Sequence, residues 1–260
     1  MPWIARGLVD GVVTTRYPTQ PDGYGREFRA AVRVRGALPP GMAATVDGLC
    51  PTGAILPDDA MPVVDGDRCI MCGRCVAVLP EVFSFDGGLE TAHRVGPLTA
   101  NDDGSLAATQ LALVERTRAL RRSIYIRHVD TGSDGSDEWE VAALTGPIYD
   151  VQRLGIYFTA SPRHADLLLV TGAGAAAMAG PLRRTYDAIP APKVVVSVGT
   201  DAATGGLTRA GYTGTVGVAG LIPVDVVVPG SPPSPFSILH GILLAVGLLV
   251  SGPLDGRDRA

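Results

Sequence analysis

The chain has 260 residues, of which 46% are hydrophobic and 18% are charged, and its formal net charge is −4. This composition is typical of a globular protein with a buried core and excludes a disordered chain. No basic stretch forms a stripe, which argues against nucleic acid as a partner. The most apolar segment, residues 238–250, is shorter than the roughly 20 residues that span a bilayer. The N-terminus lacks the apolar core of a signal peptide, so we expect the chain to stay in the cytoplasm.

The four cysteines of the chain are Cys50, Cys69, Cys72 and Cys75. In a reducing compartment, cysteines are more often metal ligands than disulfides. The stretch "CIMCGRC" spaces three of them two residues apart, and Cys50 is followed by proline in "CPTGAI". This arrangement resembles bacterial ferredoxins, in which such a triplet and a distant Cys-Pro hold one [4Fe–4S] cluster. The resemblance implies one [4Fe–4S] cluster on these four cysteines. A structural zinc site on the same four thiolates is the alternative.

The ligands of a second ferredoxin cluster are missing from the sequence. At the spacing of the motif they would stand at Pro40, Ala43, Val46 and Leu79, and none of these is a cysteine. The resemblance therefore implies a small α+β ferredoxin-like domain, residues 1–98, reduced from two clusters to one. Its lead-in "GLVDGVVTTRYP" is similar to ferredoxin-type subunits of respiratory complex I and related hydrogenases.

Residues 99–122 predict a polar linker followed by a helix with an apolar stripe. From residue 123 the pattern alternates between strands and helices, and several strands are apolar on both faces, as buried parallel strands are. The predicted strands are 123–129, 155–159, 166–171, 194–198 and 224–228, and the predicted helices lie near 137–145, 175–189 and 235–250. This order predicts an open, doubly wound α/β sheet over residues 123–253, with a tail at 254–260.

Long motifs of this second half resemble a known family. They include "VDTGS", "MAGPLRRTYDAIPAPKVVVSVG" and "IPVDVVVPGSPPSPFSILHGILLAVGLL". The family is the iron–sulfur subunit shared by complex I (its B subunit) and by formate-hydrogenlyase-type [NiFe] hydrogenases (their small subunit). The resemblance implies a flavodoxin-like domain that holds a terminal [4Fe–4S] cluster at the carboxyl ends of its strands.

The four ligand positions of that terminal cluster carry no cysteine in this chain. The residues that stand there are Asp134, Asp137, Asp201 and Ser231. Three carboxylates and a hydroxyl are poor ligands for sulfide-bridged iron, which prefers thiolate. We therefore predict that the terminal cluster is lost.

Three interpretations of the acidic stretch "GSDGSDEWE" remain open. Asp137 with Glu140 fits the D-x-x-E pattern of a capped helix start. Carboxylates and a hydroxyl would also suit Mg²⁺ or Ca²⁺. Glu138, which matches the glutamate after the second ligand in the hydrogenase branch, could serve a proton route.

Other signals are weaker. "GAGAAA" at 172–177 follows a strand and fits G-x-G-x-x-A, with Asp201 after the next strand, but we favour a plain strand-to-helix turn over a dinucleotide site. We interpret His128, His164 and His240 as structural residues. The sequence has no G-x-S-x-G motif of a serine hydrolase, and we identify no catalytic residue.

Together these observations predict an electron-transfer, non-catalytic subunit of a hetero-oligomeric complex I-like or hydrogenase-like oxidoreductase. Its partners would be a large-subunit homologue and membrane-arm subunits, which would hold it peripherally on the inner face of the cell membrane. The alternatives are a structural scaffold subunit of such a complex, and a soluble metal- or nucleotide-binding protein on the same fold.

Overall fold

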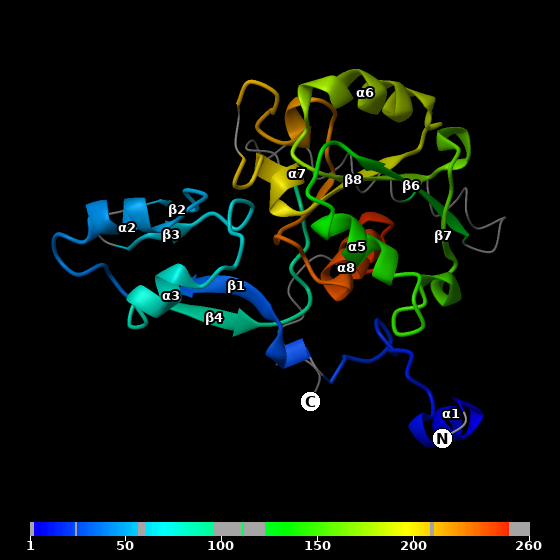
Figure 1. Cartoon of the computed structure of the whole chain (residues 1–260), viewed down its shortest axis with the longest axis horizontal. Coiled ribbons are helices and arrows are strands. Elements are labelled where there is room, and N and C mark those ends of the chain that lie inside the picture. The colour runs from blue at the N-terminus through cyan, green and yellow to red at the C-terminus, as the bar shows by residue number, and fades with distance from the viewer. Residues whose placement is uncertain are drawn as a thin grey trace.

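The computed structural model describes residues 3–23, 25–56, 61–95, 111, 123–208 and 211–249. It shows an N-terminal lobe of short strands and helices beside a larger lobe built on one sheet (Figure 1). Apart from Leu111, the linker and helix expected at 99–122 lie outside the described residues, as does the expected tail at 254–260. The domain limits at 98 and 123 remain predictions.

The larger lobe is built on a six-stranded sheet in the order β5-β10-β9-β8-β6-β7. The strands are β5 (His93–Arg94), β6 (Ile124–Asp130), β7 (Ile156–Phe158), β8 (Leu167–Thr171), β9 (Val194–Val198) and β10 (Val226–Val228). The strands β6 to β10 pair in parallel, whereas β5 runs antiparallel to β10. Without β5, the order by chain position is 2-1-3-4-5, which is the flavodoxin-like order. The predicted α/β class with a parallel sheet is confirmed.

Helices cover both faces of this sheet (Figure 1). Their bounds are α5 (Ser136–Ala143), η2 (Val151–Leu154), η3 (Pro162–His164), η4 (Ala176–Met178), α6 (Ala179–Ala188), α7 (Thr200–Thr204), η5 (Val218–Gly220) and α8 (Pro235–Ala245). Along β8, Leu167 and Leu169 face the core that contains α8, and Leu168 and Val170 face the core that contains Leu182 of α6. This alternation explains why the strand is apolar on both sides.

Three predicted helices differ from the structure at their ends. The helix expected at 235–250 ends at Ala245, because Gly247 adopts a positive φ of 74° and the N–H of Leu248 bonds back to the Leu243 carbonyl. The helix expected at 175–189 is split into η4 and α6, and the helix expected at 137–145 is α5, displaced toward the N-terminus. The short helix α7 lies in a segment for which we predicted neither a strand nor a helix.

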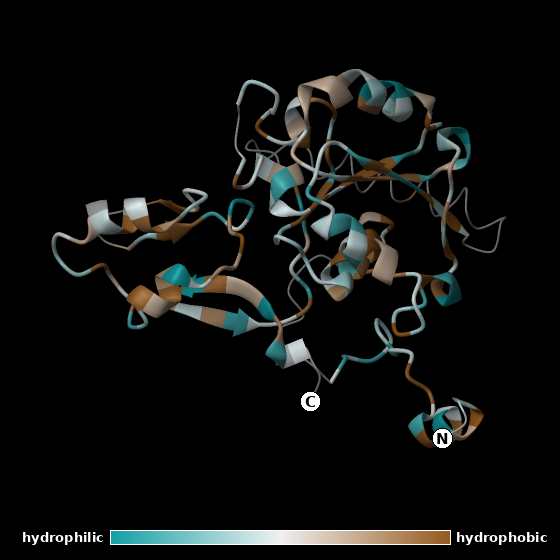
Figure 2. Cartoon of the chain, in the orientation of Figure 1, coloured by the Kyte–Doolittle hydropathy of each residue, from teal (hydrophilic) through white to brown (hydrophobic). Residues whose placement is uncertain are grey.

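Helix α8 is a core helix, and all eleven of its residues are buried. Figure 2 shows it and the neighbouring strands in the hydrophobic colour. Within the part of the chain that the structure describes, no helix has the length and apolar character needed to cross a membrane. The ring of Phe236 meets those of Tyr17, Phe28 and Tyr149 edge-on, and Ser237 Oγ donates to the Leu89 carbonyl at 2.9 Å. N-terminal segments therefore pack directly on the larger lobe.

The N-terminal lobe consists of two similar halves. Its elements are β1 (Arg29–Val34), α2 (Ala43–Leu49), β2 (Ile55–Leu56), β3 (Val63–Val64), α3 (Arg74–Val78) and β4 (Phe83–Gly87). They are preceded in the chain by α1 (Trp3–Asp10), which lies apart from this lobe (Figure 1), and by η1 (Gly25–Glu27). β1 pairs antiparallel with β4, and β2 pairs antiparallel with β3. The order from β1 to β4 is β-α-β-β-α-β, with one helix in each half. The chain then continues into β5, which joins the sheet of the larger lobe.

Candidate iron–sulfur site and a neighbouring acidic pocket

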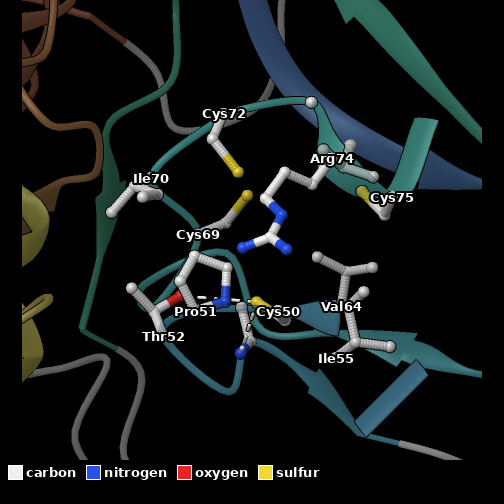
Figure 3. A pocket seen from close by; sticks show the side chains of 13 residues that line it. Cys50, Pro51, Thr52, Ile55, Val64, Cys69, Ile70, Cys72, Arg74 and Cys75 are labelled. Carbon is white, nitrogen blue, oxygen red and sulfur yellow. Dashed lines mark hydrogen bonds between the residues drawn. The ribbon is translucent and has the colours of Figure 1, made fainter. Parts of the chain in front are cut away.

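The structure brings all four cysteines to one hollow of the N-terminal lobe. Cys50 follows α2, Cys69 and Cys72 lie in the loop before α3, and Cys75 lies on α3. The hollow has a volume of about 350 Å³, part of it open to solvent. Figure 3 shows the sulfur atoms around one space, into which the guanidinium of Arg74 reaches. Residues more than a dozen positions apart thus offer their thiols to a single site.

The cysteine loop folds back through two residues with left-handed backbone. Met71 has φ 54° and Gly73 has φ 78°. This conformation is unfavourable for methionine, and such residues concentrate at functional sites. A Cβ at Gly73 would lie 3.1 Å from the ring of Phe85, so the loop also needs glycine for its close packing on β4.

The thiols differ in acidity. Burial raises the pKa of Cys50, but hydrogen bonds from the Thr52 hydroxyl and from backbone N–H groups, including that of Ala54, outweigh it, so the pKa is lowered. The Ala54 N–H donates to the Cys50 sulfur at 3.2 Å. Burial raises the pKa of Cys69 to about 11 and also raises that of Cys75. Binding of cationic iron would displace the thiol protons, so occupation of the hollow depends on pH.

The residues at the hollow fit an iron–sulfur cluster. Thiolates are the donors that such clusters require, and N–H···S bonds such as that at Cys50 stabilise the sulfur charge. Apolar side chains, Val32, Ile55, Val64 and Ile70, line much of the remaining wall, and Thr52 and Arg74 contribute polar groups to it. Among the described residues, no three His, Cys, Asp or Glu side chains are arranged to hold a single metal ion. Cubane ligands need not converge on one point, because each binds a different iron.

Apolar packing occupies two of the four positions where the ferredoxin resemblance would put the ligands of a second cluster, whereas Pro40 is exposed and Ala43 is half-buried. Val46 is fully buried and Leu79 is 5% exposed. Both belong to the core of the N-terminal lobe, together with Val82 and Phe83. Cys75 is a member of the same core. The two halves of the lobe therefore share one core, to which one half contributes Cys75 and in which Val46 and Leu79 stand at positions of the missing ligands.

The four residues at the terminal-cluster positions follow the ends of three parallel strands. Asp134 follows β6, Asp201 lies on α7 after β9, and Ser231 follows β10. Asp134 and Ser231 are exposed, whereas Asp137 on α5 is 4% exposed. Burial, and then the nearby negative charges that include those of Asp201 and Asp134, raise the pKa of Asp137. The described residues contain no group of carboxylates arranged to hold a cation.

The predicted capping role of Asp137 is wrong. Helix α5 begins at Ser136, and its N-cap is Gly135, which makes no side-chain hydrogen bond. The Asp134 carboxylate accepts bonds from the N–H and hydroxyl of Ser136 at 2.9 and 2.6 Å instead. Asp137 is in the first turn but points into the protein, because its carboxylate packs against Gly199.

Glu138 belongs to a separate polar network. The hydroxyls of Ser133, at 2.7 Å, and of Thr171 donate to its carboxylate. Thr171 Oγ1 also lies 3.0 Å from Nε2 of His128. This chain of polar atoms connects β6, β8 and α5, and the proton route suggested for Glu138 remains a prediction.

The glycines of "GAGAAA" serve close packing of loops. Gly172 and Gly174 have φ values of 80° and 74°. A Cβ at Gly172 would lie 2.8 Å from the backbone of Gly132, and one at Gly174 would lie 2.6 Å from Thr215 Oγ1. This geometry agrees with a strand-to-helix turn. Among the histidines, His164 is exposed, whereas His240 is buried and its pKa is lowered to about 4 by burial.

One contact that the sequence did not predict joins the two sites. The hydroxyl of Thr200, on α7, donates to the carbonyl oxygen of Cys69 at 3.3 Å. The same hydroxyl accepts a bond from the N–H of Gly230 at 3.1 Å. The cysteine loop thus lies directly on the segment that precedes Asp201. The two residues are 131 positions apart in the sequence, and no local sequence pattern predicts such a contact.

The cysteine hollow and the flavodoxin-like sheet define an iron–sulfur protein of the oxidoreductase class. The sequence profile of NADH ubiquinone oxidoreductase, 20 Kd subunit, matches residues 135–245, and that of a 4Fe-4S single cluster domain matches residues 63–118. The second match includes Cys69, Cys72 and Cys75 but not Cys50.

Relatives agree with these profiles. The chain is 38% identical over 165 residues to Formate hydrogenlyase subunit 7 of Escherichia coli, an alignment that covers 61% of this chain and 64% of that relative. It is 36% identical over 134 residues to the Probable membrane-bound hydrogenase subunit mbhJ of Pyrococcus furiosus, covering 52% of this chain and 80% of that relative. The chain therefore belongs to the NADH ubiquinone oxidoreductase 20 Kd subunit family. A chain in the structure of the membrane-bound sulfane sulfur reductase, an archaeal respiratory membrane complex, is 29% identical, with a TM-score of 0.46 and coverage of 58% of this chain and 81% of that one.

Proposed function

We propose that this chain is an electron-transfer subunit of a membrane-associated complex resembling complex I and formate-hydrogenlyase-type hydrogenases. It carries one [4Fe–4S] cluster on Cys50, Cys69, Cys72 and Cys75. The observation that carries this proposal is that the only four cysteines of the chain line one hollow. When bound, the cluster supplies one-electron transfer, and the chemistry of the substrates belongs to the assembly.

The N-terminal lobe is ferredoxin-like in this proposal. The β-α-β-β-α-β order and the pairing of β1 with β4 and of β2 with β3 support it. Cys50, Cys69, Cys72 and Cys75 hold the iron, and the N–H of Ala54 stabilises charge on the Cys50 sulfur. The apolar walls limit the access of water, which influences the potential of a cluster.

The larger lobe carries no terminal cluster. Asp134, Asp137, Asp201 and Ser231 offer oxygen donors, and iron bridged by sulfide prefers thiolate. An electron on the cluster of the N-terminal lobe therefore has no second cluster in this chain to pass to, and it leaves the chain from the N-terminal lobe. The lobe that held the last relay in the family serves here to dock partner subunits.

Its partners are a large-subunit homologue and membrane-arm subunits, which hold the chain peripherally on the inner face of the membrane. The names of the relatives, subunits of formate hydrogenlyase and of a membrane-bound hydrogenase, support a hetero-oligomer. Copurification of a large-subunit homologue with the affinity-tagged chain from its own organism checks this part. Recovery of the tagged chain by itself overturns it.

Iron and sulfide analysis of the purified chain tests the cluster assignment. The expected result is about four irons and four sulfides per chain, with the EPR signal of one reduced cubane. About eight irons would overturn the loss of the terminal cluster. An iron-free chain that still binds the large subunit would instead establish the structural scaffold.

A further inference from the structure

The buried carboxyl of Asp137, with the charges of Asp134 and Asp201 beside it, is called the acidic pocket, and one backbone segment separates it from the cysteine loop. Thr200 donates to the Cys69 carbonyl at 3.3 Å, and Gly199 directly precedes Thr200. The carboxylate of Asp137 packs on Gly199, where an added Cβ would lie 2.3 Å from Oδ2. Contacts thus run from Cys69 through residues 199–200 to Asp137. Because the two residues between them, Gly199 and Thr200, are buried, a change of charge at the cysteines would be weakly screened by solvent on its way to this carboxylate.

Asp137 is an unusual carboxyl group in its own surroundings. It is 4% exposed, and its Oδ1 has no hydrogen-bond partner among the described residues. A buried carboxylate without a partner is unfavourable when ionised, whereas the neutral acid is tolerated. Burial, followed by the charges of Asp201, Glu138, Asp134 and Asp130, raises the pKa of Asp137 to about 8.

Among the described residues, the one permanent cation near this pocket, Arg127, shares a face of β6 with Val129 of the core on the α6 side and is directed away from α5, whose Val141 packs in the opposite core. Burial lowers the pKa of His128 on β6, which therefore favours its neutral form. Burial alone lowers the pKa of His240 on α8, the helix that packs against α5. The elements packed around Asp137 contribute the following ionisable groups: Arg127, His128 and Asp130 from β6, Asp134 from the following loop, Glu138 and Glu140 from α5, Asp201 from α7 and His240 from α8. Carboxylates predominate in this set.

We propose that Asp137 is a redox-linked proton site, which binds one proton when the cluster held by the neighbouring cysteines is reduced. The electron comes from a one-electron donor, such as another iron–sulfur centre, and the proton comes from solvent. One O–H bond forms on Asp137, and no bond breaks. On oxidation the electron and the proton leave again. This inference rests on the proposed cluster at the four cysteines.

The sign of the effect follows from charge. The arriving electron adds one negative charge beside a pocket that is already negative, so it strengthens proton binding by Asp137. By linkage, proton binding equally favours the arrival of the electron. Reduction therefore becomes more difficult as the pH rises through the range in which Asp137 loses its proton. The protonation state of Asp137, in the lobe that lost its cluster, thereby influences the reduction potential of the cluster on the four cysteines.

A potentiometric titration of the loaded chain, followed by EPR from about pH 6 to about pH 10, tests the inference. The midpoint potential should fall with rising pH, approaching a slope of about 59 mV for each tenfold change in proton concentration. The midpoint potential should be constant at lower pH and should begin to fall near pH 8, where Asp137 of the oxidised protein releases its proton. A potential that does not change across this range overturns the proton site.

Variants identify the group. Asp137→Asn cannot titrate and should give a flat potential, whereas Asp201→Asn removes a neighbouring negative charge and should move the slope to lower pH. Glu140→Gln on the same helix is the matched control and should leave the profile unchanged. Redox difference infrared spectra should contain a protonated-carboxyl band that Asp137→Asn removes. A slope that persists in Asp137→Asn overturns the assignment.

Iron analysis of each sample separates the two proposals. A chain with about four irons and a pH-independent potential retains the proposed function and loses the proton site. A chain without iron overturns both.

Discussion

The cysteine hollow and the acidic pocket occupy neighbouring positions, but they differ in how they take part in the folding of their lobes. Cys75 belongs to the buried core of the N-terminal lobe, and Cys50 and Cys69 pack against it. In the larger lobe, Asp134 and Ser231 are exposed and Asp201 is half-buried, so only Asp137 of the four terminal-cluster positions is buried. The packing of the sheet therefore depends little on three of these four positions, whereas three of the four cysteines contribute to the packing of the N-terminal lobe. This difference explains how one site could lose its ligands while its fold persisted.

The largest expected effect is the loss of the cluster on substitution of one cysteine. Cys72→Ala removes one of four thiolates, and a [4Fe–4S] cluster without its fourth protein thiolate is readily lost. Iron should fall from about four per chain to below about one. Ser231→Ala, at a terminal-cluster position of the larger lobe, should leave the iron content unchanged. Iron analysis of the two variants in parallel checks the contrast, and equal losses would contradict it.

Removal of iron by a chelator should loosen one lobe selectively. Metal sites contribute their binding free energy to folding when the site depends on the metal. We expect amide exchange in β1 and β4 to accelerate by at least about 100-fold, because local opening controls this exchange. The amides of β8 and β9, which lie in the cores of the larger lobe, should keep their protection. Exchange followed by mass spectrometry checks both lobes, and uniform acceleration would show that they unfold as one unit.

The apolar side chains at positions of the missing second cluster, Val46 and Leu79, should stabilise the fold of the N-terminal lobe. Leu79→Ala should destabilise the chain by about 2–5 kcal/mol, because it opens a cavity in the core. Val78→Ala is the matched control on the preceding residue, which is 51% exposed, and should change stability by less than about 0.5 kcal/mol. Urea unfolding of the iron-free proteins measures both. A small effect of Leu79→Ala would mean that this core is not formed without iron.

The acidic pocket should destabilise the folded chain at high pH. The pKa of Asp137 is raised to about 8 on folding. The folded state therefore binds more protons than the unfolded state above the ordinary range of an aspartate, and stability falls as the pH rises toward 8. The slope contributed by this group is at most about 1.4 kcal/mol per pH unit. Asp137→Asn should flatten it, as measured by urea unfolding between about pH 5 and pH 9. If Asp137→Asn leaves the pH dependence of the unfolding free energy unchanged, the folded protein ionises Asp137 with little loss of stability.

Sequence patterns predicted the class of sheet, its strands and the family, because buried parallel strands such as Val194–Val198 have a composition that reflects their environment directly. They did not predict the end of α8 at Ala245, since the following residues are equally apolar and a glycine turn decides. One interpretation of the acidic stretch also placed the cap of α5 at Asp137, whereas the carboxylate that bonds the first residue of the helix is that of Asp134. A D-x-x-E pattern cannot distinguish a capping carboxylate from one that points inward, because that depends on the packing of α5 against the loop of Gly199.

The smallest expected effect concerns the bond that joins the two sites. Thr200→Val keeps the shape of the side chain but removes the hydroxyl that bonds the Cys69 carbonyl and the Gly230 N–H. A loss of about 1 kcal/mol is expected for a hydrogen bond of this kind. Thr200→Ser retains the hydroxyl and should lose less. Urea unfolding measures the difference.

The same variants test how a charge at the cysteines reaches Asp137. If the charge acts through space, Thr200→Val should leave the pH dependence of the cluster potential intact, because Asp137 and Gly199 stay in place. If the hydroxyl itself transmits the charge, that dependence should weaken in Thr200→Val and persist in Thr200→Ser.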